Sequence, residues 1–325
     1  MSEYFNSMVS YLRIPMIASS GIALVASSLL YFKQTEIIYP RNIPPDARTN
    51  VPRPSTYGIS NAEDLMIPTP DGESLSAFLI RPANRQHARN VTILMFHGNA
   101  GNIGHRVPIA KILSEDISCN ILMLQYRGYG LSTGTPNEKG LTIDAQTGLD
   151  YIRERAELRD TKIVIYGQSL GGAVGIGLAA KNEQHGDIGG IILENTFLSI
   201  RKLIPRQVGI ICCSSIFPPA RFIAPLCHQL WPSDEVLPRI ETIPILFLAG
   251  IQDEIVPHTH MKTLYSVCRT KDKIWREFPE GSHNDTVAEE GYFDAIGDFI
   301  LKYVVARPRK AIVNEKGDTL QSTTT

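Results

Sequence analysis

Hydrophobic positions follow two alternating patterns from residue 61 onward. Continuous apolar, β-branched runs are typical of strands buried on both faces, and longer Ala/Leu-containing stretches are typical of helices. The apolar runs lie at 91–96, 120–126, 163–166, 190–193, 245–249 and 273–278. The helical stretches lie at 106–113, 141–157, 258–268 and 285–304, and a hairpin flanks Pro70-Asp71-Gly72. Strands alternating with helices predict an α/β fold with a mostly parallel central sheet and helices on both faces.

The amino-terminal pattern is different. Residues 14–32 form an uncharged apolar run between Arg13 and Lys33, which is just long enough to span a bilayer. A cleaved signal peptide and a buried helix are the alternatives; we favour a transmembrane anchor because the run is long for a signal peptide. Basic residues after the run slightly favour a cytosolic domain, whereas two Asn-x-Thr sequons, at Asn90 and Asn284, suit a luminal one. The orientation stays open.

One interval interrupts the alternation of strands and helices. No strand pattern occurs between residues 195 and 243, where the sequence is apolar and broken by prolines. We interpret about 198–240 as a short lid over the carboxyl ends of the strands, with ordinary packing of a connecting helix as the alternative. The expected organisation is a tail (1–13), an anchor (14–32), a proline-rich linker (33–60), an α/β domain (61–305) and a disordered tail (306–325).

Composition and charge exclude several function classes. The net charge is −1, so nothing in the sequence points to a nucleic-acid partner. The five cysteines are odd in number and lack metal-ligand spacing, so we expect no disulfide framework. We therefore expect neither a metal nor an organic cofactor.

The motif Gly-Gln-Ser-Leu-Gly at 167–171 stands between a predicted strand and a predicted helix. Strand, G-x-S-x-G and helix in this order describe a nucleophile elbow, which makes Ser169 the candidate nucleophile. Residues 130–134 match the same expression around Ser132, but Thr135-Pro136 follows them instead of a helix. We therefore interpret Ser132 as a loop residue.

A serine hydroxyl needs a base, and the base needs a carboxylate to orient it. In this arrangement the chain order is serine, acid, histidine. His283 follows the last predicted strand directly, whereas His258 and His260 begin a helix, so His283 is the candidate base. Asp253 follows the strand at 245–249 by a short turn and is the candidate acid; Glu194, at the end of the preceding strand, is the alternative.

The oxyanion formed by attack on a carbonyl needs two backbone N–H groups. Leu170 follows the nucleophile at a helix N-terminus, where the helix dipole also favours negative charge. The loop after the strand at 91–96 supplies the second candidate, Asn99, because Gly98 allows close approach to the substrate. His97 is expected to hold this loop by hydrogen bonds.

Five motifs together resemble the membrane-anchored serine hydrolases of the bud-emergence type, a branch of the α/β-hydrolases. They are His97–Gly101 (HGNAG), Tyr126–Gly130 (YRGYG), Gly167–Gly172 (GQSLGG), Glu194–Phe197 (ENTF) and Gly281–Asp285 (GSHND). The resemblance covers about residues 37–304 and implies an α/β-hydrolase fold with Ser169, Asp253 and His283 as charge-relay residues. It also implies an anchor in the endomembrane system. Within that system we expect the endoplasmic reticulum. Two residues depart from the family pattern: Gln125 stands where an aspartate is common, and Gln168 where an arginine is frequent. Neither change removes a catalytic group, so we expect them to affect loop packing or substrate binding.

The sequence therefore predicts a membrane-anchored serine hydrolase that cleaves acyl esters or thioesters through an acyl-enzyme. The apolar lid and the expected anchor favour a lipid-like or lipidated substrate. A serine peptidase of the same fold is the alternative within the enzymes. A catalytically silent, membrane-bound interaction protein is the alternative outside them, but such proteins usually lose a member of the triad, and all three residues are present here.

Overall fold

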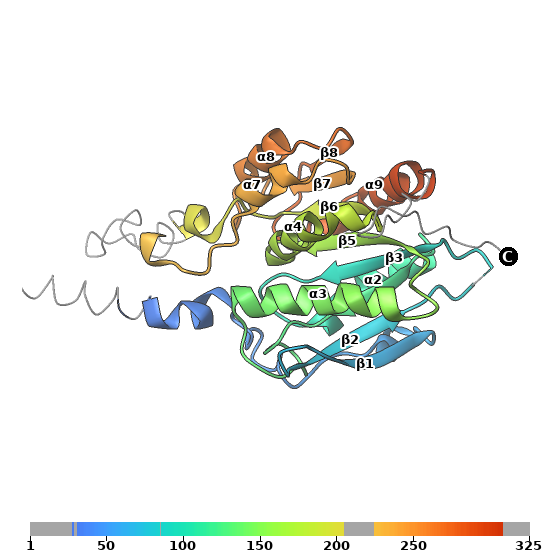
Figure 1. Ribbon diagram of the computed structural model, residues 1–325, viewed down its shortest axis with the longest axis horizontal. Coiled ribbons are helices and arrows are strands. Elements are labelled where there is room, and N and C mark those ends of the chain that lie inside the picture. Colours follow the sequence, from blue (N-terminus) through green and yellow to red (C-terminus); the bar gives the residue numbers. More distant parts are fainter. Residues whose placement is uncertain (1–27, 29–30, 85, 205–223, 308–325) are drawn as a thin grey trace, which may run out of the picture. The chain divides into compact units, whose positions relative to one another are not determined.

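The computed structural model describes residues 28, 31–84, 86–204 and 224–307 (Figure 1). The chain divides into two units. The larger unit comprises residues 39–199 and 231–325, and the smaller one comprises residues 1–38 and 200–230. The sheet and all of the candidate site residues belong to the larger unit.

The larger unit is built on an eight-stranded sheet with the order β1-β2-β4-β3-β5-β6-β7-β8. The strands are β1 (Ala62–Pro68), β2 (Ser74–Ile80), β3 (Val91–Phe96), β4 (Asn120–Leu124), β5 (Lys162–Gln168), β6 (Ile188–Glu194), β7 (Ile245–Gly250) and β8 (Lys273–Phe278). β1 pairs with β2 and β2 with β4 in antiparallel fashion, and every later pair is parallel. The strand order reverses around β3, so ligands are expected beyond the carboxyl ends of β3 and its neighbour β5.

Helices cover both faces of this sheet (Figure 1). They are α2 (Val107–Glu115), α3 (Glu138–Glu154), α4 (Leu170–Asn182), α7 (Ser233–Val236), α8 (His258–Val267) and α9 (Tyr292–Phe299), which continues into a π-helix, η7 (Ile300–Val305). Short 3-10 turns are η1 (Pro54–Tyr57), η2 (Ile103–Arg106), η3 (Glu183–His185), η5 (Leu237–Arg239) and η6 (Thr286–Ala288). The observed architecture confirms the predicted α/β class with a mostly parallel sheet.

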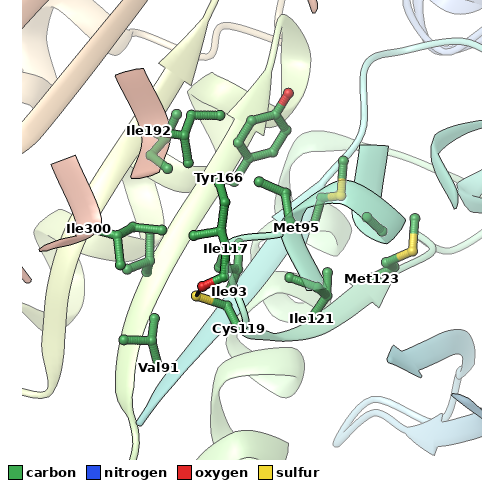
Figure 2. Close-up of a cluster of buried hydrophobic side chains, with 14 of the residues drawn as sticks. Val91, Ile93, Met95, Ile117, Cys119, Ile121, Met123, Tyr166, Ile192 and Ile300 are labelled. Atoms are coloured by element: carbon green, nitrogen blue, oxygen red, sulfur yellow. Dashed lines mark hydrogen bonds between the residues drawn. The ribbon is translucent and has the colours of Figure 1, made fainter. Parts of the chain in front are cut away.

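The hydrophobic core on one face lies between the sheet and α2, α9 and η7 (Figure 2). Alternate residues of β3, Val91, Ile93 and Met95, point to this face, as the two-residue period of a strand requires. Ile300 of η7 packs against the same cluster. All six residues of β3 and of β7 are buried, because helices cover the sheet from both sides. This explains why their sequences are continuously apolar instead of alternating.

Part of the segment expected to be a linker is folded onto the larger unit. Tyr39 and Ala47 are fully buried, and the side chain of Asn102 donates hydrogen bonds to the carbonyls of Ala47 (3.0 Å) and Asn50 (2.8 Å). A stretch without regular secondary structure can pack in this way because a side-chain amide replaces the missing backbone partners. Ile59, near the end of this segment, belongs to the hydrophobic core, and Val51 and Tyr57 pack against it.

The smaller unit joins two segments that are far apart in sequence. Residues 31–38 are helical, and the Gln34 side chain accepts hydrogen bonds from the backbone N–H groups of His228 (2.8 Å) and Gln229 (3.2 Å). The Arg201 guanidinium donates to the carbonyl of Cys227 at 2.9 Å. Residues 227–229 of the predicted lid therefore pack with the helix at 31–38, whose first two residues belong to the predicted anchor.

Several predicted segments lie largely outside the described residues. They are the tail at 1–13, most of the anchor at 14–32, the middle of the lid at 205–223 and nearly all of the carboxyl-terminal tail. Within residues 31–84, 86–204 and 224–307, no helix combines the length and the apolar character that a membrane crossing needs. The anchor therefore stays a prediction.

Candidate active site

Ser169 occupies a sharp turn between β5 and α4. Its backbone has φ +53° and ψ −115°, a conformation that non-glycine residues rarely adopt. A Cβ atom on Gly167 would lie 2.2 Å from the carbonyl oxygen of Gly171, and one on Gly171 would lie 2.2 Å from that of Phe96. Both positions therefore require glycine, which is the physical origin of the G-x-S-x-G spacing at this turn.

The structure brings Ser169, His283 and Asp253 together from three loops at the carboxyl edge of the sheet. The Ser169 Oγ lies 3.0 Å from Nε2 of His283, and the Asp253 Oδ2 lies 2.8 Å from Nδ1 of the same ring. All three side chains are buried. With the proton of the ring on Nδ1, where the carboxylate accepts it, Nε2 is an acceptor for the serine hydroxyl.

The carboxylate of Asp253 is fixed by its own turn. Its Oδ1 accepts hydrogen bonds from the backbone N–H groups of Ile255 (2.9 Å) and Val256 (2.7 Å). Both bonds fix the orientation of the carboxylate. They also leave Oδ2 as the oxygen that faces His283.

Glu194, the alternative acid, has different partners. Its carboxylate accepts a hydrogen bond from the Tyr292 hydroxyl at 2.7 Å and another from Tyr166, and the Gln168 amide lies 3.3 Å from its second oxygen. Burial raises the pKa of Glu194 above its usual value, because a carboxylate without solvent is disfavoured. Geometry and charge therefore both favour Asp253 as the partner of His283.

The loop after β3 lies beside the nucleophile. A Cβ atom on Gly98 would lie 3.7 Å from the Cβ of Ser169. His97 Nδ1 lies 2.6 Å from the carbonyl oxygen of Gly98, and its Nε2 lies 2.7 Å from the amide nitrogen of Gln125. The Gln125 amide oxygen accepts from the N–H of Ile103 at 2.8 Å, so its nitrogen is the group that donates to the ring.

The charge state of His97 follows from its surroundings. Burial lowers the pKa of His97 to about 3, so the ring is neutral and carries its proton on Nδ1, which donates to the Gly98 carbonyl. The peptide between Gly98 and Asn99 is planar and trans. The N–H of this peptide belongs to Asn99 and points in the direction opposite to the Gly98 carbonyl. It therefore points away from His97, which binds that carbonyl.

Ser132 uses its hydroxyl within the fold. The side chain is fully buried; it donates to the carbonyl of Gln125 at 2.9 Å and accepts from the N–H of Ser76 at 2.9 Å. These bonds tie the loop that contains the second G-x-S-x-G match to β2. This agrees with the interpretation of Ser132 as a loop residue.

Three further residues support the site, and local sequence patterns did not assign them a role. Glu254 accepts a hydrogen bond from the backbone N–H of His283 at 3.1 Å. The Thr196 hydroxyl donates to the carbonyl of Ser169 at 2.7 Å, and Asn195 binds the loop of His283. For Asn195 and Thr196 the signal in the sequence is the Glu-Asn-Thr-Phe motif, which begins at the last residue of β6.

Metal ligands do not gather in the described part of the chain: no three His, Cys, Asp or Glu side chains there are placed to hold an ion.

Comparisons with known proteins agree with this architecture. A family model described as the alpha/beta hydrolase fold matches residues 91–210. The chain is 39% identical over 304 residues to protein bem46 of Schizosaccharomyces pombe, covering 93% of this chain and 97% of that protein. It is 38% identical over 283 residues to the uncharacterized membrane protein YNL320W of Saccharomyces cerevisiae, covering 87% and 94%. It is 34% identical over 304 residues to the alpha/beta hydrolase domain-containing protein WAV2 of Arabidopsis thaliana, covering 91% and 96%.

Solved structures share the fold at lower identity. An alpha-beta hydrolase from Vibrio vulnificus has a TM-score of 0.65 at 19% identity, covering 81% of this chain and 91% of that one. The Pyrococcus furiosus esterase Pf2001 has a TM-score of 0.63 at 17% identity, covering 78% and 94%.

Proposed function

Because this chain belongs to the α/β-hydrolase family, we propose that it is a serine hydrolase that cleaves acyl ester or thioester bonds through Ser169, His283 and Asp253. The observation that carries the proposal is the continuous set of hydrogen bonds from Ser169 Oγ through the His283 ring to Asp253, at 3.0 and 2.8 Å. This geometry allows proton transfer from the hydroxyl to Nε2 while the carboxylate holds the other ring nitrogen.

In the proposed reaction Ser169 Oγ attacks the acyl carbonyl and His283 Nε2 takes its proton. Asp253 then stabilises the imidazolium that forms. The resulting tetrahedral oxyanion is bound by the backbone N–H groups of Leu170, at the start of α4, and Asn99. The loop contacts of His97 support this role of Asn99, because they hold the peptide that carries its N–H.

Collapse of the tetrahedral intermediate breaks the bond to the alcohol or thiol, and His283 returns the proton to that leaving group. A water molecule then attacks the acyl-enzyme with His283 again acting as base, which releases the acid and restores Ser169. These two half-reactions need only the groups already assembled at the site.

We further propose a lipid-like or lipidated substrate, on the basis of the apolar sequence at 198–240. The expected result is a kcat/KM for p-nitrophenyl esters that rises from acetate to medium chains and then levels off. Each methylene buried in an acyl site would contribute about 0.8 kcal/mol at most. Ser169→Ala supplies the background rate for every ester. If acetate is the best ester, the lipid preference is wrong; amide cleavage at comparable rates would favour the peptidase alternative.

We also propose that residues 14–32 anchor the protein in an endomembrane, with the endoplasmic reticulum as the expected location. The length and apolar character of the run support this, and so does the membrane designation of the relative YNL320W. Full-length protein is expected to stay in the membrane pellet after an alkaline carbonate wash, whereas a variant lacking residues 1–32 should be released and still hydrolyse short esters. A mature protein that begins near Ser27 would instead identify a signal peptide.

A further inference from the structure

Asn195 is the first residue after β6, and its side chain is held between two loops of the site. Its backbone has φ +45°, a left-handed conformation that asparagine tolerates better than most residues. The residue is only 1% exposed. Its amide oxygen accepts a hydrogen bond from the N–H of Gly250 at 2.9 Å. Gly250 ends β7 and begins the turn that carries Asp253.

The amide nitrogen of Asn195 contacts the second loop. It lies 3.1 Å from the carbonyl oxygen of Ser282, 3.2 Å from that of His283 and 2.9 Å from the hydroxyl of Thr286. The Thr286 hydroxyl itself donates to the Ser282 carbonyl at 2.7 Å, so it can only accept from Asn195. One side-chain amide therefore bridges the end of β7 and the loop that carries His283.

We propose that Asn195 is a positioning residue that fixes Asp253 and His283 relative to each other. The inference rests on the serine hydrolase reaction proposed above. The bond between Asp253 Oδ2 and His283 Nδ1 joins the same two loops, and the tautomer that makes Nε2 basic depends on that bond. Direct backbone bonds, such as Gln252 N–H to the Gly281 carbonyl at 3.0 Å, also join the loops. Asn195 adds a side-chain contact that holds the His283 carbonyl itself together with the end of β7.

The chemistry of the side chain suggests a selective test. Aspartate has the same shape and also tolerates positive φ, so Asn195→Asp preserves the packing and the bond from Gly250. An ionised carboxylate cannot donate to the carbonyls of Ser282 and His283, whereas a protonated carboxyl can donate to one of them. Burial raises the pKa of such a carboxyl. The defect of this variant should therefore deepen as the pH rises.

The experiment compares kcat and KM for p-nitrophenyl acetate across pH in full-length Asn195→Asp and wild-type protein. We expect kcat to fall by about 10- to 100-fold, because small misplacements of catalytic groups cause losses of this size. KM should change little, because Asn195 is buried behind the reacting groups. The ratio of variant to wild-type kcat should fall further with rising pH. Asn195→Gly, which removes the amide and relieves the backbone, should lower kcat without this pH-dependent ratio.

Asn182 offers a matched control at the far end of α4. It is 3% exposed, and its amide nitrogen donates to the Gln146 side chain at 3.0 Å and to the Leu178 carbonyl at 2.9 Å. Asn182→Asp removes these two donated bonds far from the reacting groups, while its carboxylate stays beside the Arg153 guanidinium, which donates to the Asn182 oxygen at 3.0 Å. Whatever the change in melting temperature, kcat and its pH profile should stay close to wild type.

Two results are decisive against the proposal. In the first, the loss of kcat in both aspartate variants follows the drop in their melting temperatures, and their pH profiles run parallel to that of the wild type. Asn195 then supports only the fold, and this inference fails while the proposed function stands. If wild-type protein does not hydrolyse the ester, the proposed function fails, and this inference fails with it.

Discussion

Replacement of Ser169 with alanine is expected to lower ester turnover by about a millionfold, which is the size of effect seen when a triad serine is removed. The hydroxyl lies 3.0 Å from Nε2 of His283, and no other atom of the side chain can form the acyl-enzyme. The fold should be preserved, because alanine keeps the Cβ and adds no bulk to the turn. Hydrolysis of p-nitrophenyl acetate, followed with purified protein, measures the effect.

Ser132→Ala is the control for this prediction. It removes a buried hydroxyl that bonds the carbonyl of Gln125 and the N–H of Ser76, so it should lower the free energy of unfolding by about 1–3 kcal/mol. Ester turnover per folded molecule should remain near wild type. Loss of turnover in Ser132→Ala together with retained turnover in Ser169→Ala would mean that the nucleophile has been misassigned.

Asp253→Asn is expected to lower kcat by about ten thousandfold, as the same substitution does in serine proteases. Because Oδ1 accepts two backbone hydrogen bonds, the asparagine oxygen should take that position and its NH2 group should face His283. The ring would then have to accept at Nδ1 and carry its proton on Nε2, where it cannot take a proton from Ser169. Adding His283→Ala to this variant should cost at most about a further hundredfold, far less than the same change costs in the wild type, because the three groups act as a unit.

Glu194→Gln separates the two candidate acids. The glutamine keeps most of the shape beside Tyr166 and Tyr292, and burial already disfavours the ionised form of Glu194 by raising its pKa. Turnover should therefore stay within about tenfold of wild type, since no group in contact with the reacting atoms is removed. A large loss in Glu194→Gln with little loss in Asp253→Asn would assign the acid to Glu194.

The fold class could be predicted from the sequence, because parallel strands that are covered on both faces have continuously apolar sequences. The boundaries of some helices could not. The helix predicted from 141 begins at Glu138, since the Asn137 side chain caps it by accepting from the N–H of Gly140 at 2.9 Å. The helix predicted over 285–304 is broken into η6, α9 and η7; Gly291, with φ +78°, separates the first two.

The candidate site was predictable where a residue stands at the carboxyl end of a predicted strand. Ser169, Asp253 and His283 all have such positions, so topology alone predicted that they would meet. The supporting contacts of Asn195, Glu254 and Gln125 depend on side-chain directions across three loops, and no local pattern encodes these directions. In the sequence Gln125 is only a departure from a family pattern, whereas in the structure its amide orients the ring of His97.

The most direct test of the central claim is covalent labelling of the full-length wild-type protein with a fluorophosphonate, followed by identification of the modified peptide by mass spectrometry. The account predicts a single modified residue, Ser169, with labelling abolished in Ser169→Ala, much slower in His283→Ala and retained in Ser132→Ala. Modification of another serine, or folded wild-type protein that remains unlabelled, would contradict it.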